Sequence, residues 1–592
     1  MGLSGALGCE SSPSGGSDGG SLAPPAADVV DAGSVRVEPR PEGRFEVIRG
    51  ALGGDVFRGV ALGDCDGDGR LDVVAFGGST LLALFAGRDG PRFERLPDAP
   101  LVQDTTAAVF ADLDGDGIDE LVLAGSSVQA LPGQGRCRYG APVTLAGPAD
   151  ATAAQVLVTD VNRDGLADIS ITQGNSERAP HRLLIARGDG AFDEFTPAPT
   201  PLAYEHSEPR YIGFGMFYED LDGDGAVDLF ALLDQHRGWF SWGTASGGLA
   251  QSRDDAVSEF VATNDAMGLS PIDHDRDGTI DWFVSGVYSR SRLLRAVAPR
   301  RFVDVASRAG VDGVGPDFAW GSYSFDADLD GWPDLLVLRQ GPEMAPDVLP
   351  APGPVTLFLN RHDGSFAEVS DEAIGLSLNA KGLACGPLSS DGPVGCFAMD
   401  RGGPVLLVDG LRSLGGQGLV RLRGTVSAPD GTGARLRVDG VSPPMTFAIG
   451  GQSPYGGEHA RWLQVPLLER AAATVTIVWP SGIEQRGVSV TAGLATEVIE
   501  PTAVTLSRRV APADGRSDVV VTIAPSLVGA RASAASVELL GVGSWVDGPT
   551  VDAGGTVRRV LRAPSAPGEA RLIVHIDGRP LWVRPRVVFV QA

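Results

Sequence analysis

One pattern of oxygen-bearing side chains recurs six times between residues 64 and 334. Its first copy is D-C-D-G-D-G-R-L-D, from Asp64 to Asp72, and every copy has Asp, Asn or Glu at positions 1, 3, 5 and 9 and Gly at position 6. Alternate residues of a tight turn can direct their oxygens toward one point, and Ca²⁺ takes six to eight such ligands. The pattern therefore predicts six calcium loops and about six bound ions.

An isolated Asp-Gly string is usually a solvated turn, but six copies with one donor spacing favour cation sites. The loop shares its first three donors with the EF-hand loop, whereas its closing acid stands at position 9 rather than 12. We expect Ca²⁺ to act as a structural clamp rather than as a switch. The predicted ligands are Asp64, Asp66, Asp68 and Asp72; Asp112, Asp114, Asp116 and Glu120; Asp160, Asn162, Asp164 and Asp168; Asp220, Asp222, Asp224 and Asp228; Asp273, Asp275, Asp277 and Asp281; and Asp326, Asp328, Asp330 and Asp334.

Short apolar runs must position these loops. Each loop is followed by a run of strand length, such as Val73-Val74-Ala75-Phe76 after the first. Loop starts lie 48, 48, 60, 53 and 53 residues apart, which suits four short strands with their turns. A strand, an Asp-Gly turn and a Phe also recur as a hairpin, at 84–93, 183–192 and 357–366. These periods predict an all-β chain that contains a seven-bladed β-propeller.

A seventh, altered copy follows the Asp326 loop and begins at Pro387. Its donor positions hold Pro387, Ser389, Asp391 and Gly395. With at most one carboxylate, this copy is not expected to bind Ca²⁺. Cys385 and Cys396 flank it, and we predict that a disulfide between them replaces the ion as the clamp of the seventh blade.

The N-terminus resembles the end of a bacterial lipoprotein signal, because small residues from Leu3 onward precede Cys9. A Gly/Ser-rich stretch follows, typical of a flexible tether, so Cys9 is a lipidation candidate and residues 1–33 a truncated signal and leash. Four further cysteines permit disulfides in an exported chain, and the pairing of Cys65 and Cys137 stays open. We expect an outer-membrane or cell-surface lipoprotein, or a secreted protein.

The loops and hairpins resemble the FG-GAP or VCBS-type repeat of integrin α-chain propellers and bacterial surface proteins. Phe302 to Val311, followed by Ala319-Trp320-Gly321, looks like the version in cartilage acidic protein and its bacterial relatives. The resemblance implies a propeller over residues 34–415 and an ASPIC/UnbV domain over 416–500, matched by Gly433 to Val438, Gly450 to Tyr455 and Val478 to Gly482. Residues 501–592 resemble an invasin-type Ig-like β-sandwich.

The composition and charge of the chain exclude some classes of partner and of enzyme site. The 592 residues carry a formal net charge of −27, which disfavours nucleic acid and anionic lipid as partners. Contact with a membrane is expected only through a lipid on Cys9. Gly 81 and Pro 42 fit a turn-rich β-protein. Lys381 is the only lysine, so a P-loop is excluded, and the seven histidines form no H-E-x-x-H motif.

These observations favour a non-enzymatic, calcium-binding adhesion or ligand-binding protein that recognises an extracellular protein or glycan through propeller loops. Two alternatives stay open: a polysaccharide lyase or hydrolase, and an envelope assembly scaffold. The enzyme would most plausibly use the region of His206, Tyr211, His236, Trp239 and Trp242, although packing or turn roles are favoured for these residues. Arg187-Gly188-Asp189 matches the tripeptide that integrins recognise, but turn chemistry explains it.

Overall fold

The structure is a computed structural model that describes residues 43–53, 56–77, 82–97, 102, 104–149, 152–176, 181–195, 211–222, 226–234, 239–244, 249–251, 266–287, 290–313, 318–341, 350–411, 415–449, 452–453, 457–501, 503–524, 535–552, 555–576, 579–581 and 583–591. Cys9 with its predicted tether, and Asp224 of the fourth loop, lie outside these residues. Among the described residues, no helix has the length and apolar character that crossing a membrane requires.

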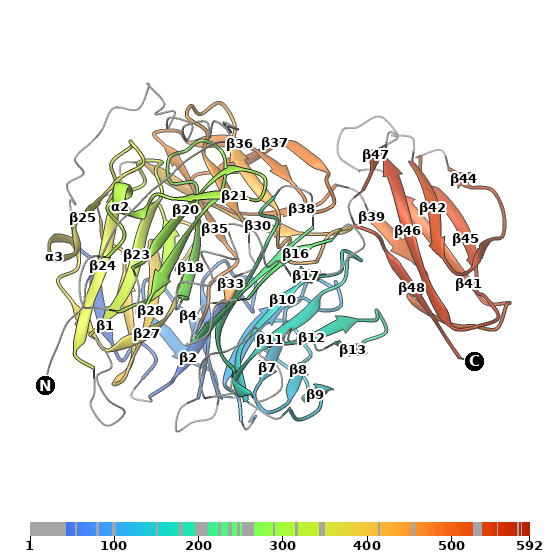
Figure 1. The fold of residues 1–592 in the computed structure, drawn as a ribbon, viewed down its shortest axis with the longest axis horizontal. Helices are drawn as coiled ribbons and strands as arrows, with labels where there is room; N and C mark the ends of the chain where they lie inside the picture. Colours follow the sequence, from blue (N-terminus) through green and yellow to red (C-terminus); the bar gives the residue numbers. More distant parts are fainter. Residues whose placement is uncertain are drawn as a thin grey trace, which may run out of the picture.

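Residues 46–408 form antiparallel sheets that repeat one four-strand unit (Figure 1). In chain order the units are β2 (Gly59–Gly63), β3 (Asp72–Phe76), β4 (Leu82–Gly87) and β5 (Phe93–Arg95); β6 (Ala107–Ala111), β7 (Glu120–Ala124), β8 (Val128–Leu131) and β9 (Val143–Ala146); β10 (Thr152–Thr159), β11 (Asp168–Ser176), β12 (His181–Ala186) and β13 (Phe192–Phe195); β14 (Tyr211–Glu219), β15 (Asp228–Asp234), β16 (Trp239–Gly243) and β17 (Leu249–Gln251). They continue with β18 (Ala266–Ile272), β19 (Asp281–Gly286), β20 (Arg292–Ala298) and β21 (Arg301–Asp304); β22 (Phe318–Phe325), β23 (Asp334–Gln340), β24 (Pro352–Asn360) and β25 (Phe366–Glu368); and β27 (Ala380–Pro387), β28 (Val394–Asp400) and β29 (Gly403–Val408). Two short helices, α2 (Ala306–Ala309) and α3 (Ser370–Ala373), and the short strand β26 (Ser377–Leu378) lie between these strands.

The units close into a ring. The first strand of each unit contacts the first strand of the next, and β27 contacts β2. The last unit takes its outer strand from the start of the chain, because β1 (Glu46–Arg49) pairs with β29. Strands such as β3 and β7 are buried at every residue, since apolar side chains from neighbouring units cover both of their faces. This explains their continuous apolar sequences.

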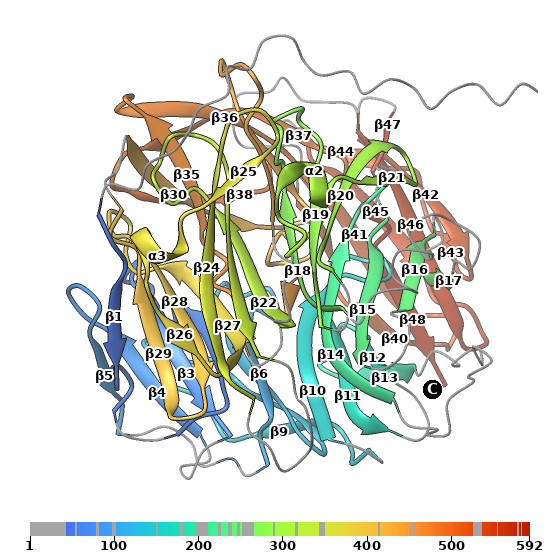
Figure 2. The same cartoon turned by 60° about the vertical axis from the view of Figure 1, so that its left-hand side comes forward.

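A segment from the next part of the chain enters the ring, where Figure 1 labels its strand β33 (Gln452–Ser453). Figure 2 shows other strands of that part, such as β35 (Leu463–Leu468) and β36 (Ala472–Val478), above the ring. Strand β33 pairs with β14, and strand β34 (Gly457–Glu458) of the same segment pairs with β2. We call residues 452–460, apart from the undescribed 454–456, the axial segment. Just after β34, the His459 Nδ1 accepts a hydrogen bond from the Cys385 N–H at 3.0 Å, and the Ala460 N–H donates to the Cys385 carbonyl at 2.9 Å. The axial segment therefore joins inner strands of different units.

The rest of residues 416–499 forms two small sheets. One contains β30 (Gly416–Arg423), β35 (Leu463–Leu468) and β38 (Ala495–Ile499), and the other contains β31 (Arg435–Val438), β32 (Thr446–Ala448), β36 (Ala472–Val478) and β37 (Glu484–Thr491). They share one apolar core, which includes the fully buried Trp479. We call this part the cap.

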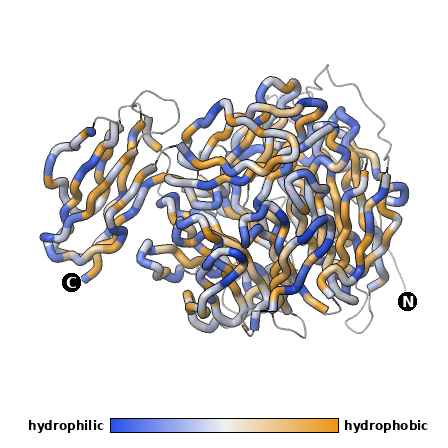
Figure 3. Tube along the Cα trace, turned by 180° about the vertical axis from the view of Figure 1, so that it is seen from behind, coloured by the Kyte–Doolittle hydropathy of each residue, from blue (hydrophilic) through white to orange (hydrophobic). Residues whose placement is uncertain are grey.

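Residues 503–591 form a sandwich of two sheets, shown in red at one end of the molecule in Figure 1. Its strands are β39 (Ala503–Leu506), β40 (Val510–Pro512), β41 (Asp518–Ala524), β42 (Ala535–Gly541), β43 (Ser544–Trp545), β44 (Thr550–Val551), β45 (Val557–Arg562), β46 (Gly568–Ile576), β47 (Arg579–Pro580) and β48 (Arg586–Val590). Residues alternate between buried and half-buried along β41, and Figure 3 shows hydrophobic and hydrophilic residues mixed along the strands at this end of the molecule. One face of each sheet therefore supplies the core.

Candidate metal centres

Each of the six predicted loops joins the first strand of a unit to its second strand. The first loop, for example, begins directly after β2 and ends with Asp72, the first residue of β3. Because the units repeat one topology around a ring, all six loops lie at the same end of it. We call this end the loop face.

Backbone N–H groups fix the carboxylates at positions 1 and 5. In the second loop, Asp112 accepts hydrogen bonds from the Gly115 N–H at 2.7 Å and the Gly117 N–H at 2.9 Å. Asp116 accepts one from the Ile118 N–H at 2.7 Å. The first, third, fifth and sixth loops repeat the bonds from position 6 to position 1 and from position 7 to position 5. The sequence pattern thus specifies a recurring loop conformation.

The acid at position 9 links three strands of its unit. Asp72 accepts the Cys65 N–H at 2.9 Å and the Gly87 N–H at 2.8 Å, so that it connects the first loop with the end of β4. Glu120, Asp168, Asp228 and Asp334 make the equivalent pair of bonds. In the fifth loop, Asp281 accepts the Ala296 N–H at 2.9 Å, and the His274 Nδ1 takes the place of the backbone N–H at position 2. This acid anchors the unit in addition to serving as a candidate ligand.

Position 4 of the loop is also special, which the sequence pattern did not reveal. It adopts a left-handed conformation as Gly67 and Gly115 in the first two loops, and as Arg163, Arg276 and Leu329 in the third, fifth and sixth. The φ values of these three side-chain-bearing residues are 61°, 53° and 55°. Non-glycine residues seldom adopt such angles, and the constraint is hidden because only two of the five described copies use glycine.

Three loops bring acidic oxygens close enough to share one ion. The groups Asp64, Asp66 and Asp72; Asp112, Asp114 and Glu120; and Asp220, Asp222 and Asp228 each present one oxygen per residue within 4.8 Å of the others. His274, Asp275 and Asp281 form such a group in the fifth loop. The three all-carboxylate groups offer only hard oxygen donors, which suit Ca²⁺. Positions 1, 3 and 9 of these loops therefore fit the predicted metal.

In the first two loops, the acids at positions 1 and 9 are buried close to further carboxylates. Burial, together with the neighbouring carboxylates Asp66 and Asp64, raises the pKa of Asp72 to about 7. The same causes raise the pKa of Asp112 to about 6 and that of Glu120 to about 7. A divalent cation among these groups would favour their ionised forms. The local electrostatics thus favours a cation in the first and second loops.

Basic side chains lie beside several loops. Arg300 Nε is 2.5 Å from Asp222 Oδ2, and Arg295 Nε is 2.7 Å from Asp275 Oδ2. These arginine side chains are 48% and 26% exposed, so each can turn toward solvent. The His362 Nε2 similarly contacts Asp330 at 2.6 Å in the sixth loop. If these basic side chains turn toward solvent, a cation can bind the loop carboxylates in their place.

Two disulfides lie near the loops. Cys385 and Cys396 are bonded across the paired strands β27 and β28, on either side of the altered seventh copy. Cys65 at position 2 of the first loop is bonded to Cys137, which follows β8. The second bond settles the pairing that the sequence left open, and it connects two neighbouring units.

The cap covers the loop face. Arg421 Nη2 lies 2.8 Å from Asp119 Oδ1 in the second loop, and Arg435 donates to the Asp220 carbonyl in the fourth. From the fifth loop, Arg276 Nε donates to the Pro444 carbonyl at 3.0 Å. Figure 1 shows the cap strands β36 and β37 at this end of the ring. The expected exposure of these loops to an external ligand is therefore reduced.

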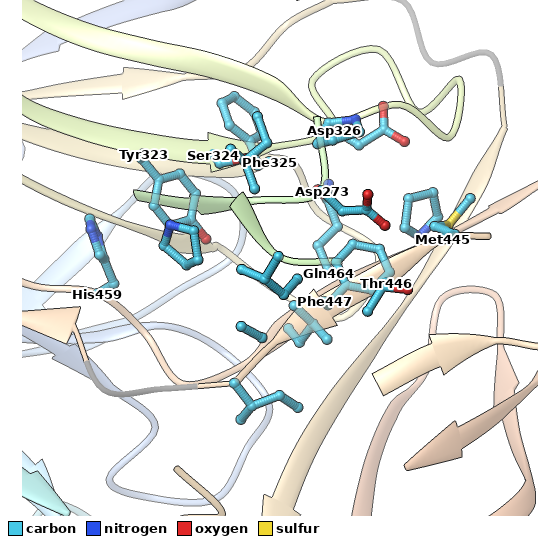
Figure 4. Close-up of a pocket in the computed structure, with 18 of the residues that line it drawn as sticks. Asp273, Tyr323, Ser324, Phe325, Asp326, Met445, Thr446, Phe447, His459 and Gln464 are labelled. Atoms are coloured by element: carbon cyan, nitrogen blue, oxygen red, sulfur yellow. The ribbon is translucent and has the colours of Figure 1, made fainter. Parts of the chain in front are cut away.

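A cavity of about 120 Å³ lies between the loop face, the axial segment and the cap (Figure 4). Asp273, Asp326, His459 and Gln464 are among its lining residues. His459 Nε2 and Gln464 Oε1 are buried without a hydrogen-bond partner among the described residues. Burial lowers the pKa of His459 to about 3, so the ring is neutral and its Nε2 can donate. The volume suits about four water molecules.

The structure describes only part of the region that the sequence offered for an enzyme site. His206 and His236 lie outside the described residues, and only the backbone positions of Tyr211 and Trp239 are described, in β14 and β16. Trp242 is 5% exposed, packs against Phe240, and lies under the Arg300 guanidinium. These contacts give Trp242 a packing role.

The Arg187-Gly188-Asp189 tripeptide forms the turn between β12 and β13. Arg187 pairs with Asp189 at 3.4 Å. A Cβ at Gly188 would lie 2.4 Å from the Arg509 side chain of the sandwich. The turn therefore contacts the sandwich at Gly188, while Gly188 and Asp189 remain exposed.

A family model described as an FG-GAP-like repeat matches residues 64–123 and 220–284. These spans contain the first, second, fourth and fifth loops, so the chain contains FG-GAP-like repeats in two regions. No curated protein matches the chain significantly.

Several solved structures are similar to this chain. One is a chain in the crystal structure of BBS1N in complex with ARL6DN, with 10% identity and a TM-score of 0.39 over 62% of this chain and 98% of that one. Another is AofleA from Arthrobotrys oligospora, with 10% identity and a TM-score of 0.29 over 56% and 90%. A third is the D00-D0 domain of intimin, with 16% identity and a TM-score of 0.15 over 27% and 79%.

Proposed function

We propose that this protein is an extracellular, non-enzymatic binding or adhesion protein built on a seven-bladed, calcium-loaded propeller. The observation that carries the proposal is the convergence of three acidic oxygens within 4.8 Å in the first, second and fourth loops. The ring of four-strand units and the FG-GAP-like repeats support the propeller. Six loops of one design support about six cation sites, with the third loop treated separately below.

Calcium is proposed to act as a structural clamp. The position 9 acid already joins three strands through its backbone hydrogen bonds. An ion held by positions 1, 3 and 9 would add a link between the end of the first strand and the start of the second. Millimolar external calcium saturates even weak sites, so the ions would be permanently bound outside the cell.

The ligand is proposed to be a protein or a glycan. Because the cap covers the loop face, the proposed ligand surface is the opposite end of the ring. Strands β13, β17 and β23 finish at that end of the ring, and the sequence stretches that join them to the next strands are among the longest in the ring. Loops carried by a rigid scaffold are common places for binding residues.

We further propose that the cap is an ASPIC/UnbV domain and that the sandwich is Ig-like. Two disulfides support an exported protein, because such bonds persist in oxidising compartments. Cys9 is the proposed lipid attachment site, and a lipid there would be the only contact with a membrane.

The function is tested in two steps. Equilibrium dialysis followed by metal analysis should find several Ca²⁺ ions per chain, and fewer in an Asp66→Ala variant than in wild type. A glycan array and a pull-down of surface proteins, both in 1 mM Ca²⁺ and repeated in EDTA, should then find a ligand. A full chain that binds no calcium would overturn the proposal, whereas release of reducing sugar from a glycan would favour the enzyme alternative.

A further inference from the structure

The third loop differs from the others in the cation that it meets. Arg586, the first residue of β48 in the sandwich, places its Nε 3.0 Å from Asp164 Oδ2. The Asp164 side chain is fully buried, and that of Arg586 is 7% exposed. Asp164 stands at position 5, so one of its oxygens, which an ion would need, already faces a guanidinium.

The arginine is held in place from more than one side. Arg586 also donates through Nη2 to the Ala186 carbonyl at the end of β12, and its Nη1 lies 3.5 Å from Glu569 Oε2. The arginines beside the fourth and fifth loops are 48% and 26% exposed and can turn away. Arg586 has no such freedom, because protein surrounds it on the loop side and on the sandwich side.

The third loop also offers less charge to an ion. Its position 3 is Asn162, so it has three carboxylates where each of the other loops has four. A second arginine approaches from the turn before β40, where Arg509 Nη1 donates to the Asp164 carbonyl at 3.1 Å. Calcium affinity falls as the number of charged ligands falls, and two cations nearby oppose a third.

Further contacts turn the loop into a docking surface. The Arg584 N–H donates to the Arg163 carbonyl at 2.5 Å, and Arg571 Nη1 donates to the Asn162 carbonyl at 3.3 Å. Positions 3, 4 and 5 of the loop therefore each bind an arginine of the sandwich. Among the described residues, the ion pair of Arg586 with Asp164 is the contact that joins the sandwich to a buried loop carboxylate.

We propose that Arg586 replaces Ca²⁺ as the cation of the third loop, and that the loop serves as the socket for the C-terminal sandwich. The chain then binds up to five calcium ions rather than six. The inference rests on the proposed function, because it takes the other loops as calcium sites.

The first experiment counts ions in matched variants of the full chain. Asp116→Ala and Asp164→Ala change the same loop position, in the second and third loops. Equilibrium dialysis at 1 mM free Ca²⁺ should show one ion fewer for Asp116→Ala and no change for Asp164→Ala. Loss of one ion from both variants would overturn the inference while supporting the proposed function.

The second experiment changes the arginine. Arg586→Met should allow one additional ion to bind, whereas Arg586→Lys keeps the charge and should bind as many ions as wild type. If Arg586→Met does not fold, the ion counts of Asp116→Ala and Asp164→Ala still test whether the third loop binds calcium. An unchanged ion count in folded Arg586→Met would contradict the replacement.

The third experiment needs no calcium. In EDTA, hydrogen exchange of the amides in residues 160–168 and 584–590 should rise at least tenfold in Asp164→Ala and stay unchanged in Asp116→Ala. Unchanged exchange in Asp164→Ala would contradict the socket. A wild-type chain that binds no calcium at all would overturn the proposed function, and the exchange result would then decide the docking separately.

Discussion

Removal of calcium should lower the melting temperature of this protein by roughly 10 °C. The perturbation is EDTA against 10 mM Ca²⁺ at pH 7.5. An extracellular site with a dissociation constant of about 0.1 mM would then contribute about 2.7 kcal/mol by mass action. Counting only the first, second and fourth loops, whose acidic oxygens converge within 4.8 Å, the bound ions would together contribute about 8 kcal/mol.

The temperature shift follows from the size of the ring. Roughly 370 residues lie between positions 46 and 411, and unfolding releases about 2.1 cal/mol/K per residue. Dividing about 8 kcal/mol by the resulting entropy of about 0.8 kcal/mol/K gives the expected shift of roughly 10 °C. Differential scanning calorimetry on metal-free protein, with and without added Ca²⁺, measures it.

A pair of variants in the second loop makes the test specific. Asp114→Ala removes a ligand oxygen and should reduce the calcium-dependent shift by about 3–4 °C. Asp119→Asn is the control, because Asp119 pairs with Arg421 rather than with the carboxylate group. It should lower the melting temperature equally in both buffers. Equal melting in EDTA and calcium, after metal analysis has verified complete removal, would refute the clamp.

Three further predictions concern the loop acids, the disulfides and the axial segment. In EDTA, the free energy of unfolding should fall as pH rises from about 4 toward 9. The reason is that the folded pKa values of Asp72, at about 7, and Asp228, at about 9, lie above those of the unfolded chain. Calcium should reduce this fall, and denaturant titrations in EDTA that show the opposite slope would contradict the prediction. Loss of the Cys65–Cys137 bond should lower the free energy of unfolding by about 4 kcal/mol, and loss of the Cys385–Cys396 bond by about 3 kcal/mol, in the chain-entropy model. The difference arises because the sequence separations are 72 and 11 residues. Urea unfolding of the two double serine variants measures both values, and a larger loss for Cys385–Cys396 would contradict the loop-length argument. Gly457→Val should destabilise the chain by about 1–3 kcal/mol, because a Cβ there would lie 2.9 Å from the Ala384 Cβ and 3.0 Å from the Leu383 carbonyl oxygen. The control is Gly147→Val, because a Cβ at Gly147 has open space around it. Thermal melting should show a lower melting temperature for Gly457→Val and little change for Gly147→Val.

The sequence predicted the local design well because the pattern is repeated. Loops with donors at fixed positions and apolar runs after them define a strand, a turn and a second strand, and the structure has these at each described copy. The regular spacing of the loop starts indicated four strands per unit. His274 was missed as a partner of Asp281, because position 2 carries no constant residue type.

The contacts between distant parts of the chain were not predictable. Nothing in the sequence around Gln452 indicates a strand that enters a ring of other strands. Arg421, Arg435 and Arg586 are ordinary basic residues in β-strands, and only the folded chain shows that they meet loops from a much earlier part of the sequence. Such contacts depend on three-dimensional placement, which no local period encodes.

The pairing of β1 with β29 has a consequence for how the protein is made. The outer strand of the last unit is among the first described residues to be synthesised, whereas its partner is the last strand of the ring. Closing so long a loop is entropically costly, and chains dominated by distant contacts fold slowly. The ring is incomplete until Val408 has been made, and the axial segment joins it only after Glu458. The chain therefore reaches its final fold only after most of it has been synthesised.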